Sequence, residues 1–406
     1  REAVRRYLKI ERPVLVATAG TQPAWLLLSR RGRKLRREAI WELVKKYGIK
    51  NHLIQWNDGP GFDSIYNQLS EAGFHIQESG KGRNMFLSFG IAMALGAESI
   101  GLLDADIRTF KRVQLDRLFY PVVALNYDFS KAYYARILER SLFGRVKRLL
   151  LDPLLLSLKR KFTESKEEKM LRLIDFLLGF QYQLSGEVAF HVNLLKKMRF
   201  AMNWGVEIFT LIEVYRKAST PAQVMFSELP FDHKHQEISE GDQTKGLHRM
   251  GMDIVTTLMN ALVIEEGLEI SDTFFQDLAI TYQAVAEDQI KKYSDDAGFS
   301  NLIYDRDAEE NLVRSVFQNS ILNAGELLTS PLRITEKFLR FVNSYSEFKP
   351  FLEKGLAEAI LSVESKVQKR VFEMPKTVSW ERVSNKLPQI FYDLIEVVEK
   401  EKRCFS

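Results

Sequence analysis

The stretch SIGLLDAD, residues 99–106, places a short apolar strand directly before two aspartates, Asp104 and Asp106. Side chains alternate along a strand, but a turn at its end can bring both carboxylates toward one hard cation. A divalent ion held there can bridge the phosphates of a nucleotide. Aspartates at a strand end also form ordinary turn caps, so the pair by itself leaves two interpretations open.

The sequence around this stretch alternates between strand and helix patterns. We predict strands at 14–17, 24–28, 52–56 and 99–103, and helices at 33–47, 63–72 and 84–95. Such alternation indicates an α/β fold with a Rossmann-like, mostly parallel sheet, in which ligands bind at the carboxyl ends of the strands. Asp58 would stand at such an end, where it would either contact a nucleobase or ribose or only form an Asx-turn.

From about residue 250 onward, helical patterns follow one another without strands. We expect helices at 251–268, 272–296, 307–322, 331–347, 350–367 and 386–402. A domain boundary is therefore expected after residue 245, with an α/β domain over 1–245 and a helical C-terminal region over 246–406.

The composition excludes several classes of protein. Lys and Arg number 58 against 53 Asp and Glu, and this net charge of +5 is weak for a nucleic-acid-binding protein but suits small phosphorylated anions. The single cysteine, Cys404, excludes a disulfide framework and a cysteine-based zinc site. No apolar run approaches the roughly 20 residues of a membrane span. We therefore expect a cytoplasmic protein that binds neither nucleic acid nor membranes.

Two glycine-containing motifs carry positive charge. In GKG, residues 80–82, the glycines allow a ligand to approach closely, and Lys81 would neutralise a diphosphate at a helix N-terminus. In GRVKR, residues 144–148, Arg145 and Lys147 would suit a phosphate. The alternatives are a basic surface turn and the edge of an amphipathic helix.

The remaining candidates are histidines and glutamates. The segment FDHKHQ contains His233 and His235, which suit one metal ligand and one substrate contact, or else a surface loop. Glu187 ends the turn LSGE, and Glu207 ends the segment WGVE at the start of a predicted helix. An acidic residue in a first helical turn also interacts favourably with the helix dipole, so Glu207 has a purely structural alternative.

Taken in order, these motifs resemble those of nucleotide-sugar-dependent glycosyltransferases of the GT-A fold. More narrowly, they are similar to the glucosyl-3-phosphoglycerate synthase family, whose relatives include mannosylglycerate synthase. The similarity runs from about residue 50 into the helical tail, and one departure is Asn203, where the family usually has aspartate. The motifs are GKGRN (80–84), DADI (104–107), LFYPV (118–122), KAYYAR (131–136), GRV (144–146), LSGE (184–187), WGVE (204–207), EVYR (213–216), DHKHQ (232–236), YDR (304–306) and SWERV (379–383).

The resemblance implies a retaining, metal-dependent transfer of glucose from UDP-glucose or GDP-glucose to the 2-hydroxyl of 3-phosphoglycerate. The product would be glucosyl-3-phosphoglycerate, a precursor of the compatible solute glucosylglycerate. Mg²⁺ or Mn²⁺ would be the cofactor, and we expect a homodimer. A mannosyl donor, a glycerate acceptor and a non-catalytic sugar-nucleotide-binding relative stay open as alternatives.

The resemblance also implies a role for each candidate residue. By the family pattern Asp106 and His233 bind the metal. The catalytic residues would be Asp104, Asp106, Glu187 and Glu207. The donor would be bound by Asp58, Gly80, Lys81 and Asp104, and the acceptor by Arg145, Lys147, Leu184, Ser185, Gly186 and His235.

Overall fold

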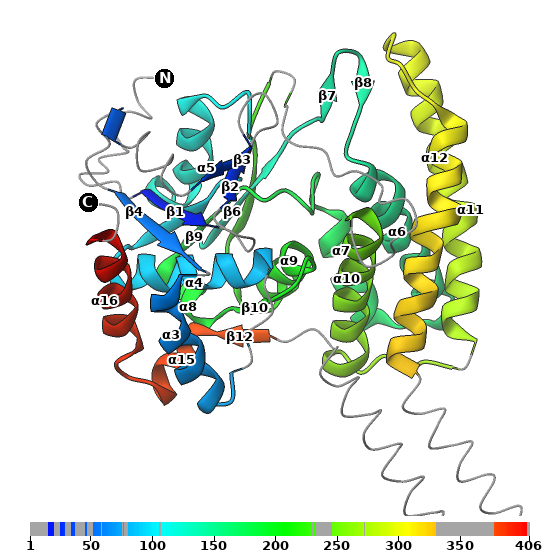
Figure 1. Ribbon diagram of the computed structural model, residues 1–406. Coiled ribbons are helices and arrows are strands. Elements are labelled where there is room, and N and C mark those ends of the chain that lie inside the picture. Colours follow the sequence, from blue (N-terminus) through cyan, green and yellow to red (C-terminus); the bar gives the residue numbers. More distant parts are fainter. Residues whose placement is uncertain are drawn as a thin grey trace, which may run out of the picture.

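Figure 1 shows the computed structural model of the chain, in which helices pack around twisted strands and a second group of helices lies beside them. The structure describes residues 15–19, 25–28, 34–36, 45–46, 52–57, 59–74, 76, 80–104, 107–228, 231, 246–271, 273–329 and 377–403. The α/β class predicted from the sequence is confirmed.

The N-terminal strands form two small pairs. β1 (Leu15–Ala19) runs parallel to β4 (His52–Trp56), and β2 (Trp25–Leu28) runs antiparallel to β3 (Lys34–Arg36). The strands predicted in these regions are confirmed. The helix predicted over 33–47 is wrong at its start, because residues 34–36 pair with β2 in register Leu27 to Leu35. Pairing with a neighbouring apolar strand here overrides the helical spacing of the apolar residues.

Four strands form the sheet that carries the candidate site, in the order β11-β6-β9-β5. They are β5 (Ser99–Leu102), β6 (Phe129–Tyr133), β9 (Val188–His191) and β11 (Pro221–Met225). β6 is parallel to β11, whereas β9 is antiparallel to both β5 and β6. Strands β5, β6 and β11 therefore run in the same direction and β9 runs against them, so this sheet is mostly parallel with one reversed strand.

The direction of β9 determines which residues meet at that edge. Since β5 and β6 are both antiparallel to β9, their carboxyl ends lie beside its amino end. Asp104 follows β5, Tyr134 follows β6 and Glu187 precedes β9. The topology therefore brings these three residues to one edge of the sheet, although they are far apart in the sequence.

Helices pack around these strands and form a second group at the other side of the molecule (Figure 1). Those near the strands are α3 (Pro60–Glu71), α4 (Lys81–Ala94), α5 (Arg112–Ala124), α8 (Val192–Lys197) and α9 (Val206–Lys217). The second group contains the π-helical turns η1 (Val146–Leu151), η2 (Ala261–Glu265) and η3 (Val313–Phe317) and the helices α6 (Asp152–Ser165), α7 (Glu168–Leu178), α10 (Gly246–Asn260), α11 (Phe274–Phe299) and α12 (Arg306–Leu312).

No bounds were predicted for α5, α6, α7 or α8, whereas most of the helices that were predicted within the described residues are present. Those predicted at 251–268, 272–296 and 307–322 are confirmed, while those at 331–347 and 350–367 lie outside the described residues. One large buried hydrophobic cluster includes side chains from both groups of helices. Within the described ranges, no helix combines the length and the apolar character that crossing a bilayer requires.

The last described segment returns to the N-terminal half of the chain. Strand β12 (Thr377–Ser379) pairs antiparallel with β10 (Arg199–Ala201), and α15 (Trp380–Lys386) and α16 (Ile390–Arg403) follow. The buried indole of Trp380 stacks on Phe86 of α4 with 4.3 Å between ring centroids, and its Nε1 donates to the Phe86 carbonyl over 2.8 Å. Figure 1 shows α16 lying against α3, α4 and β4.

The domain boundary expected after residue 245 stays a prediction.

Candidate active site

A lysine between two carboxylates forms the centre of the candidate site. Lys81 is the first residue of α4, and its Nζ lies 2.9 Å from Oδ1 of Asp104 and 2.7 Å from Oε1 of Glu207. Although burial opposes the charged form, the two carboxylates raise the pKa of Lys81 well above its ordinary value. The structure thus brings together three predicted site residues, from the end of β5 and the first turns of α4 and α9.

The glycines on either side of Lys81 set the position of that turn. A Cβ on Gly82 would lie 1.9 Å from the carbonyl oxygen of Ala201, and one on Gly80 would lie 2.9 Å from that of Met202. Such distances are sterically forbidden, so α4 can start this close to β10 only because both residues are glycine. Gly80, predicted to bind the donor, therefore has at least a packing role.

Several hydrogen bonds hold the loop that precedes β9 against β6. Ser185 Oγ donates to the Ala132 carbonyl over 2.6 Å, and the Ala132 amide donates to the Glu187 carbonyl over 3.0 Å. Lys131, which is buried, donates from Nζ to the Ser185 carbonyl over 2.8 Å. A Cβ on Gly186 would lie 2.4 Å from Oδ2 of Asp104. The predicted acceptor loop therefore lies directly against the aspartate at the end of β5.

The glutamate of this loop has an unusual environment. Burial and the nearby charge of Asp104 raise the pKa of Glu187 to about 7, while a 2.7 Å hydrogen bond from the Tyr134 hydroxyl favours its ionised form. Burial lowers the pKa of Lys131 to about 8. Motif order did not assign a role to Lys131 or Tyr134. The available signal was a lysine inside the otherwise uncharged strand FSKAY, because a buried lysine needs an acceptor or a counter-charge.

The basic residues predicted to bind the acceptor follow the hairpin formed by β7 (Ile137–Leu138) and β8 (Ser141–Leu142). Lys147 forms an ion pair with Asp152, and Arg148 forms a buried bidentate pair with Glu309 of α12, at 2.9 and 2.6 Å. Tyr304 also donates its hydroxyl to Glu309. Arg145 lies close enough to Glu309 to be affected by its charge. The motif YDR in the helical region thus contributes to the surroundings of Arg145.

Four predicted site residues, Asp58, Asp106, His233 and His235, lie outside the described residues. The predicted metal pair of Asp106 and His233 is among them. Among the residues that are described, no group of three His, Cys, Asp or Glu side chains could hold a metal ion.

Helix α10 supports the turn that leads to Glu207. Asn203 Oδ1 accepts from the Gly205 amide over 3.0 Å and from Thr257 Oγ1 over 3.3 Å, and Asp253 Oδ2 accepts from the Trp204 amide over 3.3 Å. An amide oxygen is sufficient for both contacts of Asn203. The departure from the family's aspartate therefore leaves this turn intact.

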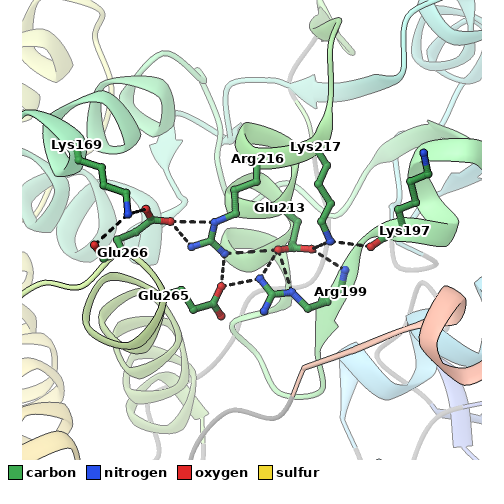
Figure 2. A network of polar contacts seen from close by, with 8 residues as sticks. All are labelled: Lys169, Lys197, Arg199, Glu213, Arg216, Lys217, Glu265 and Glu266. Carbon is green, nitrogen blue, oxygen red and sulfur yellow. Dashed lines mark hydrogen bonds and ion pairs between the residues drawn. The ribbon is translucent and has the colours of Figure 1, made fainter.

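Figure 2 shows the polar network that explains the motif EVYR. Glu213 is fully buried on α9 and accepts from the backbone and guanidinium of Arg199 and from Lys217. Arg216 donates hydrogen bonds to Glu265 and Glu266, two residues that follow α10 in the chain. Despite burial, the hydrogen bonds from Arg199 and Lys217 lower the pKa of Glu213. This network joins β10, α9 and η2 and holds α9, whose other end carries Glu207.

Comparisons with known proteins identify the family of this chain. The chain is 33% identical over 355 residues to glucosyl-3-phosphoglycerate synthase from Persephonella marina, covering 86% of this chain and 75% of that protein. It is 34% identical over 280 residues to the enzyme of the same name from Methanococcoides burtonii, covering 68% of this chain and 67% of that one. The chain belongs to the glucosyl-3-phosphoglycerate synthase family. The GT-A fold and the hexosyltransferase activity predicted from the sequence follow from this membership.

Solved structures of glucosyl-3-phosphoglycerate synthase are also similar to this chain. The enzyme from Mycobacterium tuberculosis in complex with Mn²⁺, UDP and phosphoglyceric acid matches with a TM-score of 0.42 and 18% identity, over 66% of this chain and 84% of that one. Mannosyl-3-phosphoglycerate synthase from Rubrobacter xylanophilus matches with a TM-score of 0.41 and 20% identity, over 67% and 80%. No protein-family model matches the chain.

Proposed function

We propose that this chain transfers glucose, with retention of anomeric configuration, from a nucleoside-diphosphate glucose to the 2-hydroxyl of 3-phosphoglycerate. The observation that carries the proposal is the contact of one lysine, Lys81, with both Asp104 and Glu207 at the edge of the sheet. Membership of the glucosyl-3-phosphoglycerate synthase family supports it, since the two relatives carry that enzyme's name. The cytoplasmic location and the homodimer stay predictions.

Lys81 is the group that would act on the donor. In the transfer, the bond between the anomeric carbon and the diphosphate oxygen breaks, and negative charge grows on the leaving diphosphate. The ammonium of Lys81 would stabilise that charge, because both carboxylates keep it protonated. Asp104 and Glu207 would accept hydrogen bonds from hydroxyls of the donor sugar.

We propose substitution on one face of the sugar, without a covalent enzyme intermediate. The acceptor 2-hydroxyl forms the new bond to the anomeric carbon, and its proton passes to an oxygen of the departing diphosphate. No protein base is needed for this step. A sugar covalently trapped on Glu187 or Glu207 would contradict it.

The divalent cation would be held by Asp106 and His233. A carboxylate suits Mg²⁺ or Mn²⁺, the imidazole would add a nitrogen donor, and the aspartate follows a strand that ends at the site. When bound, the cation supplies positive charge to the diphosphate. Solved structures of the Mycobacterium tuberculosis enzyme contain Mn²⁺ or Mg²⁺ together with UDP.

Arg145 would bind the phosphate of the acceptor. Donor and acceptor are both anionic, so a cationic group separate from Lys81 is required to bring them together. Leu184, Ser185 and Gly186 would line the space between the two, since Gly186 touches Asp104.

The test is product formation by mass spectrometry. Purified protein is incubated with Mg²⁺, 3-phosphoglycerate and, in turn, UDP-, GDP- and ADP-glucose and GDP-mannose. We expect a hexosyl-phosphoglycerate mass with a glucose donor and, by NMR, retention of the donor's anomeric configuration. Lys81→Met should lower kcat about 10²- to 10³-fold, whereas Lys159→Met, on the half-exposed surface of α6, should not. Absence of product with every donor would refute the proposal.

A further inference from the structure

A lysine lies buried in the middle of the sheet, and the proposed transfer assigns it no role. Lys131 occupies the centre of β6, where it pairs with Val188 of β9 on one side and with Gln223 of β11 on the other. Only 1% of this residue is exposed. A buried ammonium is costly unless it gains hydrogen bonds and opposite charge, so the groups around Lys131 indicate what it does.

The alternation of side chains along β6 determines the face on which Lys131 lies. Lys131 and Phe129 are two residues apart and therefore share one face of the sheet. Phe129 packs against Phe190 with 5.1 Å between ring centroids, in the large hydrophobic cluster to which α4 and α9 also contribute. The first turns of these two helices carry Lys81 and Glu207. Lys131 thus lies on the face of the sheet that these helices cover.

Three carboxylates of the candidate site act on Lys131. Burial lowers the pKa of Lys131 to about 8, while the charges of Glu207, Glu187 and Asp104 oppose that shift. The like charge of Lys81 adds to the lowering. Lys131 is therefore protonated at neutral pH, and it is a second ammonium near the contact of Lys81 with Asp104 and Glu207.

The same ammonium is bonded to the loop that reaches the site. Lys131 Nζ donates to the Ser185 carbonyl over 2.8 Å. The next residue, Gly186, lies so close to Asp104 that a Cβ on it would be 2.4 Å from Oδ2. A hydrogen bond from a charged donor is stronger than one between neutral groups. The position of the loop against Asp104 therefore depends on Lys131.

We propose that Lys131 is a positioning residue for the transfer, whose ammonium fixes the loop of residues 184–187 where the donor sugar meets the acceptor. The inference rests on the proposed function and deepens it, because Lys131 acts through the loop and not on the substrates. Its effect is on orientation. A misplacement of about 1 Å can lower a rate about 100-fold, while a nucleotide held by other groups stays bound.

The experiment compares Lys131→Met with the control Lys386→Met. Lys386 Nζ donates to the Ala72 carbonyl over 2.6 Å, so the control also removes a bond from a lysine to a backbone carbonyl. Kinetics give kcat and KM, and calorimetry gives the Kd of UDP or GDP, whichever the active donor releases. Hydrogen exchange followed by mass spectrometry reports on residues 184–187.

Lys131→Met should lower kcat about 10- to 100-fold, leave the Kd of the nucleoside diphosphate unchanged and speed exchange in residues 184–187. Lys131→Arg keeps a charged donor and should recover part of kcat. Lys386→Met should have wild-type values throughout. Loss of kcat without loss of nucleotide affinity, with partial recovery by arginine, is the result that a general loss of stability would not give.

Three results would overturn the inference. They are a wild-type kcat in folded Lys131→Met, a rise in the nucleotide Kd that accounts for the whole loss of kcat/KM, and unchanged exchange in residues 184–187. If Lys131→Met does not fold, Lys131→Gln decides. Its neutral side chain is one bond shorter, so a wild-type kcat would again refute the role. If neither variant folds, Lys131 serves folding rather than positioning, and the inference fails.

Failure of the proposed function gives a different result. The wild type would then form no product with any donor. The hold of Lys131 on the loop is still tested in that case, because hydrogen exchange in residues 184–187 of Lys131→Met does not depend on turnover.

Discussion

Replacing Glu187 by glutamine should raise the stability of the folded chain far more at about pH 8 than at about pH 5. Glu187 is buried at the edge of the sheet, where it accepts a hydrogen bond from Tyr134 and lies near the charge of Asp104. Glutamine has nearly the same shape and can accept the same hydrogen bond, but it has no proton to lose. The substitution therefore isolates the cost of ionising a buried carboxyl group.

The sign follows from proton binding. In the folded chain the pKa of Glu187 is raised to about 7, against an ordinary value of 4.5. Between these values the unfolded chain has released a proton that the folded chain still holds, so wild-type stability falls as the pH rises. At about 1.4 kcal/mol per pKa unit, the loss from about pH 5 to about pH 8 is about 2 to 3 kcal/mol. Glu187→Gln does not suffer this loss.

The assay is urea unfolding followed by tryptophan fluorescence, for both proteins at both pH values. The free energy of unfolding of Glu187→Gln relative to wild type should increase by about 2 to 3 kcal/mol between the two conditions. Tyr134→Phe is the companion variant, because loss of its hydroxyl should raise the pKa of Glu187 further. A difference that is the same at both pH values would refute the reasoning.

Three further substitutions test the structure. Arg148→Met leaves the carboxylate of Glu309 buried without its guanidinium, so urea unfolding should show a loss of about 3 to 5 kcal/mol. Trp380→Ala removes a fully buried indole and should cost about 3 to 5 kcal/mol by the same measurement. Gly82→Ala places a methyl group 1.9 Å from the Ala201 carbonyl oxygen and should lower kcat/KM for the donor more than about tenfold, measured kinetically.

Much of the α/β half could be predicted because its strands and helices have clear periodicity. The strand that precedes Asp104 and the helix after Gly80 are where the sequence placed them, and the helix begins at Lys81 rather than at 84. The short hairpin at 25–36 could not be predicted, because its second strand follows a helical spacing. The return of residues 377–403 to α4 and β10 is a long-range contact that no local pattern encodes.

The candidate site was predictable where motifs lie at strand or helix ends. Lys81, Asp104 and Glu207 do meet, as their positions after β5 and in the first turns of α4 and α9 suggested. The ion pair of Lys147 with Asp152 could not be predicted from the sequence. It depends on two side chains facing each other on a helix that begins with a π-helical turn. The role of Lys131 could not be predicted either, because its hydrogen-bond acceptor, the Ser185 carbonyl, lies more than fifty residues away in the sequence.

A ribosome that makes this chain completes β10 long before β12. Roughly 175 residues separate the two strands, so at about 5–20 residues per second β10 waits about 10 to 35 s for its partner. During that interval Phe86 and Gly90 on α4 lack the covering indole of Trp380. An unpaired strand beside an open apolar groove is a site for aggregation and for chaperone binding. This surface of the nascent chain therefore stays uncovered until residue 380 has left the exit tunnel.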